Sequence, residues 1–137
     1  MSNQKRIGLV IFVFLLILFV SVAFYKKNSL KNNFSITNGY IYDFGNSRYS
    51  GNTIFFKYKF SVNNIIYSAS SGVSCDRRKK FFFQSWKNGK MVQVVYDIKD
   101  PDNSSILLTK ENYKKYGLNI PNKYKSEIDY IDSLCCP

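Results

Sequence analysis

Residues 53–70, TIFFKYKFSVNNIIYSAS, decide the fold of this chain. Apolar residues occupy every second position from Ile54 to Val62, and the residues between them are mostly polar. Because side chains alternate between the two faces of a strand, this pattern predicts a β-strand with one buried face. Asn63-Asn64 follows at once, and asparagine accepts the positive φ angles of a tight two-residue turn. Residues 65–70 are therefore expected to return antiparallel and complete a β-hairpin.

Three further segments are predicted to extend this hairpin into a sheet. Residues 34–44 carry apolar side chains at even positions, which indicates a strand with one apolar face. Residues 91–96 are rich in β-branched side chains, and residues 106–108 are expected to form a short last strand. The turn-rich residues 46–52 are expected to be a loop. The even-numbered apolar residues of the first segment are Phe34, Ile36, Tyr40, Tyr42 and Phe44.

A short helix is expected between the hairpin and the strand at 91–96. Residues 81–89, FFFQSWKNG, lack the alternation of a strand and end in Asn88-Gly89, a common helix stop. The side chain of Asp76 can cap the start of this helix. We expect the three phenylalanines at 81–83 to pack against the sheet.

The C-terminal residues have helical spacing. Thr109 is expected to open one or two helical turns that Gly117 closes. Beyond Pro121, which suits a first helical turn, apolar residues recur every three or four positions. This helix is expected to lie on the domain's own sheet, and docking against a partner is the alternative. The apolar stripe consists of Ile120, Tyr124, Ile128, Ile131 and Leu134.

Residues 7–25, IGLVIFVFLLILFVSVAFY, form a run without a charge. As a helix this run is about 28 Å long, close to the thickness of the hydrocarbon core of a bilayer. The alternative is a cleaved signal peptide, since Ser21 and Ala23 precede Phe24 with small-residue spacing. The run is longer than the usual apolar core of a signal peptide, which favours a retained membrane anchor.

The predicted fold is mainly β, namely a small antiparallel sheet or partly open barrel of about five strands with a short helix. One transmembrane helix precedes it and a C-terminal helix follows it. A short basic tail before a first apolar segment most often stays in the cytoplasm, so we expect a single-pass protein of the cell membrane with an extracytoplasmic β domain. The expected parts are a basic tail at 1–6, the transmembrane helix at 7–25, a tether at 26–33, the β domain at 34–108 and a helical tail at 109–137.

The composition excludes several classes of enzyme. The chain has 137 residues, with 20 Lys and Arg against 9 Asp and Glu, and it has no histidine. Without imidazole there is no Ser-His-Asp triad, no Cys-His nucleophile and no histidine-ligated zinc. No paired acid and base stands out either, so we expect a protein that is not an enzyme and that has no metal or cofactor.

Two motifs stand out in the predicted β domain. The first is Phe56-x-Tyr58-x-Phe60-x-Val62, and the second runs from Gly89 through Val92-x-Val94-x-Tyr96-Asp97 to Pro101-x-x-Ser104-x-Ile106. Their spacing resembles a bacterial family of small membrane-anchored β domains of unknown function. Ile98 and Asp100 stand where the family has Pro and Asn. The resemblance covers residues 36–108, and it implies a small β domain on a membrane anchor without a known enzyme activity.

The second motif also has a physical explanation as a turn. Pro101 fixes φ where the chain must reverse, and Asp97 can bond nearby backbone amides, so Asp97, Pro101 and Ser104 are expected to be structural turn residues. A calcium site at Asp97, Asp100 and Asp102 is the alternative. It lacks the glycine and the bidentate glutamate of a calcium loop, which favours the turn.

The basic run Arg77, Arg78, Lys79 and Lys80 precedes the three phenylalanines. It is expected to be a solvated helix start, and contact with anionic lipid headgroups or with a partner is the alternative. A nucleic-acid partner is not expected, because the membrane anchor restricts access to nucleic acid.

The chain has three cysteines, Cys75, Cys135 and Cys136. Adjacent cysteines rarely bridge each other without backbone strain, so Cys75 is expected to pair with Cys135 or with Cys136 if the domain lies in an oxidising compartment.

Taken together, the sequence predicts a single-pass membrane protein that presents a small basic β domain as a non-catalytic binding or structural module. Its partners are expected to be the lipid bilayer and an unidentified protein, and its oligomeric state is open. An immunity-type inhibitor of a toxin acting at the membrane is the first alternative, and a binder of anionic lipid surfaces is the second.

Overall fold

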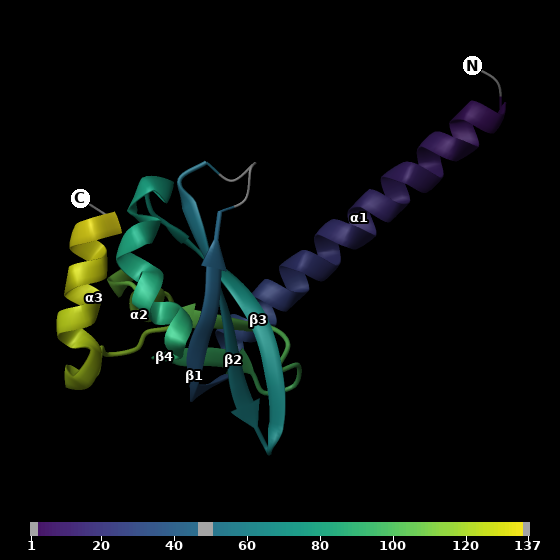
Figure 1. Cartoon of the computed structure of the whole chain (residues 1–137). Helices are drawn as coiled ribbons and strands as arrows, with labels where there is room; N and C mark the ends of the chain where they lie inside the picture. The colour runs from purple at the N-terminus through teal and green to yellow at the C-terminus, as the bar shows by residue number, and fades with distance from the viewer. Residues whose placement is uncertain (1–2, 47–50, 136–137) are drawn as a thin grey trace.

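The computed structural model describes residues 3–46 and 51–135. It consists of a long N-terminal helix that projects from a small β domain (Figure 1). In chain order the elements are α1 (Asn3–Asn32), β1 (Phe34–Gly45), β2 (Thr53–Val62), β3 (Ile65–Ser74), η1 (Arg77–Asn88), β4 (Lys90–Asp97), β5 (Ser104–Leu107), α2 (Lys110–Lys115) and α3 (Asn122–Cys135).

The five strands form one antiparallel sheet in the order β3-β2-β1-β4-β5. The predicted hairpin is confirmed, since β2 and β3 pair from Val62↔Ile65 to Thr53↔Ser74. Asn63 and Asn64 have φ angles of 51° and 65°, as a tight turn of this kind requires. The mainly β prediction with about five strands is therefore confirmed.

The sheet curls into a half-barrel. Gly39 lies in the central strand β1, where a Cβ atom would come within 2.7 Å of the Lys59 carbonyl oxygen and of a Val94 methyl group. Only glycine allows the neighbouring strands to approach this closely.

The two edges of the half-barrel are joined by side chains. The Tyr58 hydroxyl lies 3.2 Å from Ser71 Oγ on β3 and 3.0 Å from Ser104 Oγ on β5. The Ile106 N–H of β5 donates to Ser71 Oγ at 3.4 Å. Hydroxyl groups thus connect the edge strands β3 and β5.

The first core fills the inside of the curl and is largely aromatic. Helix η1 packs against β1, β2 and β4 and adds Phe83 and Trp86 to this core. The rings of Phe83 and Trp86 lie 4.7 Å apart, and Phe83 also packs edge-on against Phe56 at 5.2 Å. The predicted ends of this helix are confirmed: Asp76 accepts a bond from the Arg78 N–H, and Gly89 ends it with a φ of 93°.

The prediction that all three phenylalanines pack against the sheet is wrong. Phe83 is buried, whereas Phe81 and Phe82 are 67% and 57% exposed. The element is a 3₁₀-helix, in which residues three apart lie on one side. Phe83 and Trp86 therefore share the inner side, and Phe81 and Phe82 face outward.

A second core covers the outer face of β4 and β5. Val95 and Leu107 of the sheet pack there against Tyr113 and Tyr116, which α2 and its C-cap supply. Thr109 caps α2 and Gly117 follows it with a φ of 65°, as predicted. Helix α3 adds Ile128 to this second core and Ile131 to the first, so it lies on its own domain as expected.

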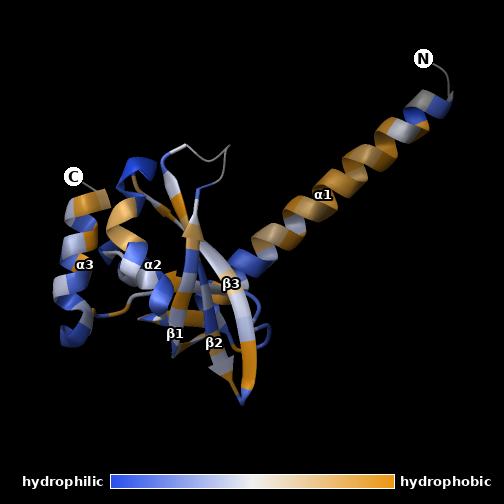
Figure 2. Ribbon diagram, viewed as in Figure 1, coloured by the Kyte–Doolittle hydropathy of each residue, from blue (hydrophilic) through white to orange (hydrophobic). Residues whose placement is uncertain are grey.

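Helix α1 is apolar over most of its length, between two hydrophilic ends (Figure 2). Residues Arg6–Asn32 of this helix are long and apolar enough to cross a membrane. The predicted tether at 26–33 is wrong as a separate segment, because the helix continues to Asn32. Its last turn has tertiary partners, since Leu30 is buried in the second core.

Candidate functional site

The most distinctive site is the junction between α1 and the β4–β5 turn, residues 98–103. Three contacts join the turn to α1 and to Asn33, the residue that follows α1. The Asn103 amide donates to the Lys26 carbonyl oxygen at 2.7 Å, and Lys26 Nζ lies 3.4 Å from an Asp100 carboxylate oxygen. The Ile98 N–H donates to the Asn33 carbonyl oxygen at 3.0 Å. These contacts and the buried Leu30 fix the end of the helix on the domain.

Asp97 organises the turn from inside. Its side chain is 1% exposed and accepts the Lys99 N–H at 3.0 Å. Burial raises the pKa of this carboxyl, but hydrogen bonds from Ser29, Lys99 and Asn103 outweigh burial and leave the pKa below its usual value. Asp97 is thus held as a carboxylate at neutral pH, and it connects α1 to the turn through Ser29.

The other two predicted turn residues have different surroundings. Pro101 lies in the turn and is half-buried, and the Asn103 N–H closes the turn by donating to the Asp100 carbonyl oxygen at 2.8 Å. Ser104 begins β5 and bonds Tyr58 across the half-barrel. Within residues 3–46 and 51–135, no group of three Cys, Asp or Glu side chains is placed to hold a metal ion.

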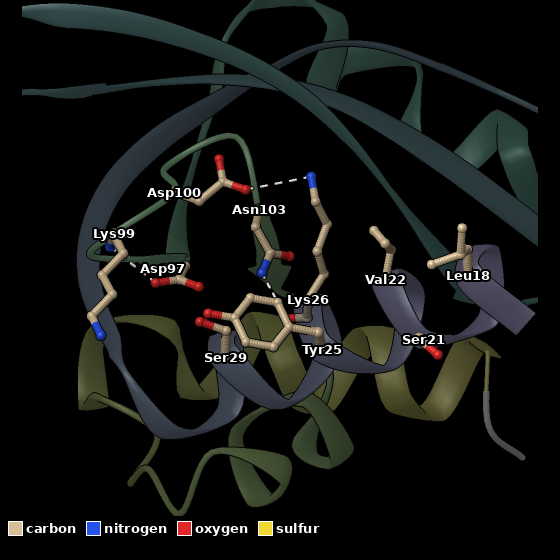
Figure 3. Close-up of a pocket in the computed structure, with 10 residues that line it drawn as sticks. All are labelled: Leu18, Ser21, Val22, Tyr25, Lys26, Ser29, Asp97, Lys99, Asp100 and Asn103. Carbon is tan, nitrogen blue, oxygen red and sulfur yellow. Dashed lines mark hydrogen bonds and ion pairs between the residues drawn. The ribbon is translucent and has the colours of Figure 1, made fainter.

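A groove of about 420 Å³ lies in the corner between α1 and the turn (Figure 3). One part of its wall is apolar and belongs to the apolar run of α1, and the other part is polar and lies at the turn. The helix supplies Leu18, Ser21, Val22, Tyr25, Lys26 and Ser29, and the turn supplies Asp97, Lys99, Asp100 and Asn103.

The basic run at the start of η1 is partly used for local structure. Arg78 forms a 2.6 Å ion pair with Asp76, and Lys79 Nζ donates to the Leu134 carbonyl oxygen. The Arg78 hydrogen bonds lower the pKa of Asp76 to about 2. Arg77 is exposed, and Lys80 Nζ lies 5.7 Å from the Phe81 ring centre. Arg77, Lys80 and the exposed Phe81 and Phe82 thus form a basic–aromatic segment.

A disulfide joins Cys75, which follows β3, to Cys135 at the end of α3. This is one of the two pairings that the sequence left open. Cys136, the other candidate, lies outside the described residues. The bond closes a separation of 60 residues and attaches the C-terminal helix to the domain.

The even-numbered apolar residues of β1 do not form the buried face that the pattern indicated. Ile36, Tyr40 and Tyr42 are exposed on the outer face, and Ile41 fills the core instead. A bulge between Ile41 and Asp43 shifts the phase, so that Phe44 is again buried.

The exposed residues of β1 have close neighbours on the adjoining strands. Tyr40 pairs with Lys59 of β2 and with Met91 of β4, and Lys59 Nζ lies 5.0 Å from the centre of the Tyr42 ring. We name this surface the outer-face patch; it consists of Ile36, Tyr40, Tyr42, Lys59 and Met91.

The sequence did not reveal the junction. Two signals were present in residues 26–32. No glycine or proline interrupts this segment, so nothing in it ends the helix, and Leu30 is an isolated apolar residue there.

No protein-family model matches the chain, and no curated protein or solved structure matches it either. The family resemblance drawn from the motifs therefore stays a prediction, and the function must be argued from the geometry.

Proposed function

We propose that this chain is a single-pass membrane protein whose β domain is a non-catalytic binding module held in a fixed orientation at the bilayer surface. The observation that carries this proposal is the junction. The apolar helix runs into the domain without a flexible segment, and Leu30, Lys26 and Asn33 attach its end to the domain. A module that is held in this way presents the same face to its surroundings at all times.

The outer-face patch is the best surface for a protein partner. Its three strands expose two tyrosines, a methionine and an isoleucine next to a lysine. Tyrosine and methionine are enriched at protein interfaces, because they bury a large area while tyrosine keeps a polar end. The Lys59 ammonium favours an acidic group on the partner.

The disulfide supports one side of the membrane for the β domain. Disulfides persist in oxidising compartments and are rare in the cytosol. The Cys75–Cys135 bond therefore supports an extracytoplasmic β domain. A cysteine placed at Ser68, in a Cys136→Ser background, should then react with a membrane-impermeant thiol reagent in intact cells. Labelling only after lysis would place the domain in the cytoplasm.

Site-specific photo-crosslinking in cells tests the binding function. A photoreactive residue at Tyr40 should give discrete adducts, and the matched control at Tyr130, an exposed tyrosine of α3, should not. The adducts should disappear with Met91→Glu, which places a charge beside Tyr40. Equal adducts at both positions, or none at Tyr40, would contradict the proposed role of the patch.

Binding to an anionic lipid surface is a second candidate, favoured by the exposure of Phe81 and Phe82 beside Arg77 and Lys80. Basic residues attract anionic headgroups, and aromatic side chains insert at the interface. A tryptophan at Phe82, in a Trp86→Phe background, should be quenched by brominated anionic lipid in nanodiscs. Quenching no stronger than for Tyr130→Trp would exclude this candidate.

A further inference from the structure

The junction groove has an apolar wall and a polar wall, which is a combination that suits an amphipathic ligand. Leu18 and Val22 lie in the apolar run of α1, and Lys26, Lys99 and Asp100 lie beyond its end (Figure 3). At 1.5 Å per residue, Leu18 lies about 12 Å along the helix from Lys26. This distance corresponds to the step from the upper acyl chains of a leaflet to its headgroups.

We propose that this groove binds one phospholipid of the surrounding bilayer. One acyl chain lies against Leu18 and Val22, and the phosphate lies beside Lys99 and Lys26. This inference rests on the proposed function, because it requires α1 to cross the membrane. Once α1 does so, the apolar wall of the groove faces hydrocarbon, and leaving it to water would cost free energy in proportion to its area.

The charges of the groove select the headgroup. Two lysines and two aspartates line it, so their charges cancel. Lys26 is paired with Asp100, and Asp97 is enclosed by its own turn. Lys99 is exposed, and within the described part of the chain its ammonium lies within 4.0 Å of no carboxylate. A zwitterionic headgroup matches this arrangement, with its phosphate at Lys99 and its ammonium near Asp100. An anionic headgroup adds a charge that the two carboxylates repel.

The groove also explains why the junction can be rigid in a membrane. The corner between the helix and the turn is not filled by protein side chains, and a lipid in it supports both walls at once. The bound lipid then contacts α1 and the turn together, and it is expected to exchange more slowly than the lipids around the rest of α1.

Native mass spectrometry of the full chain, released from nanodiscs of equal phosphatidylethanolamine, phosphatidylcholine and phosphatidylglycerol, tests the proposal. The wild-type protein should retain one phospholipid, mostly of the two zwitterionic kinds. Val22→Trp fills the apolar part of the groove, and Val20→Trp is its control on the same helix outside the groove. Lys99→Ala removes the phosphate partner, and Lys115→Ala is its exposed control.

Val22→Trp and Lys99→Ala should each lower the retained lipid about fivefold, which corresponds to about 1 kcal/mol of binding free energy, and the controls should leave it unchanged. No retained lipid in the wild type, equal loss in variant and control, or a preference for phosphatidylglycerol would overturn the proposal. Carbonate extraction of the same proteins distinguishes failure of the proposed membrane anchor from failure of the proposed lipid site. Release of the wild-type protein by carbonate would overturn the membrane anchor itself. If every protein stays in the membrane and retention is equal, only the lipid site is lost.

Discussion

At the scale of single residues, Tyr58 connects the core of the half-barrel to both of its edge strands. Its ring is fully buried in the aromatic core, and its hydroxyl contacts both edge strands. Burial raises the pKa of this phenol, and the bonds to Ser104 and Ser71 offset part of that rise. The hydroxyl therefore stays neutral and available as a hydrogen-bonding group across the physiological pH range.

Removing that hydroxyl should weaken the closure of the half-barrel. Tyr58→Phe leaves Ser71 and Ser104 without their shared partner, so we expect a loss of about 1–2 kcal/mol in the free energy of unfolding. Tyr42→Phe, on the exposed outer face, is the control and should change it by less than about 0.5 kcal/mol. Urea unfolding of the full chain in detergent measures both, and equal effects would show that the bridge contributes no stability.

The buried Asp97 predicts an acid dependence. Its pKa is lowered in the folded protein, so the stability that it contributes is present above its unfolded pKa, near 3.8, and is lost as the pH falls through the folded value. Unfolding midpoints should therefore fall steeply below about pH 4. Asp97→Asn should lower stability at pH 7 and flatten this acid decline. Asp102→Asn, an exposed change in the same turn, should leave the pH profile as it is in the wild type.

At the scale of elements, β2 and β3 could be predicted because the signals for them are local in the sequence. Apolar and polar residues alternate in β2, and the two asparagines that follow it form the turn. The sequence predicts that β1 is a strand, but it does not predict which face of β1 is buried. The bulge at Tyr42 depends on pairing with β2, and it does not change the alternation of apolar residues in the sequence. Both ends of η1 could be predicted from Asp76 and Gly89. Phe81 and Phe82 were misplaced, because the sequence does not show that this helix is of the 3₁₀ type. The helical structure of residues 26–32 was also not predicted. Contacts with β4, β5 and their turn stabilise it, and these partners are distant in the sequence.

The disulfide makes a prediction for one element, α3. Cys135→Ser combined with Cys136→Ser removes the bond and prevents the neighbouring cysteine from replacing it. For a separation of 60 residues we expect a loss of about 2–5 kcal/mol in the free energy of unfolding. Limited proteolysis should then cut first within α3, because only Ile128 and Ile131 are fully buried there. Cys136→Ser alone is the control, and if it is as unstable as the double variant, the Cys75–Cys135 pairing is wrong.

At the scale of the whole molecule, the junction sets the orientation of the β domain relative to α1. A flexible tether would let the outer-face patch and the basic–aromatic segment take any orientation toward the bilayer. The continuous helix instead fixes the orientation of each surface relative to α1. If α1 crosses the membrane as proposed, a partner in the same membrane would meet the domain from a fixed direction. Contacts at Lys26, Leu30 and Asn33 are the physical basis of this constraint.

This constraint predicts a single distance between helix and domain. Spin labels introduced through unnatural amino acids at Leu16 and Ser68, in the full chain in nanodiscs, should give one narrow distance distribution by pulsed electron resonance. Inserting Gly-Gly-Ser-Gly after Asn32 should broaden it, because the helix end then separates from the turn. Leu30→Ala should broaden it less, since the Lys26 and Asn33 contacts remain. The same insertion between β1 and β2 is the control and should leave it narrow. A broad distribution in the wild type would mean that the domain is loosely tethered, and the fixed presentation proposed for it would be wrong.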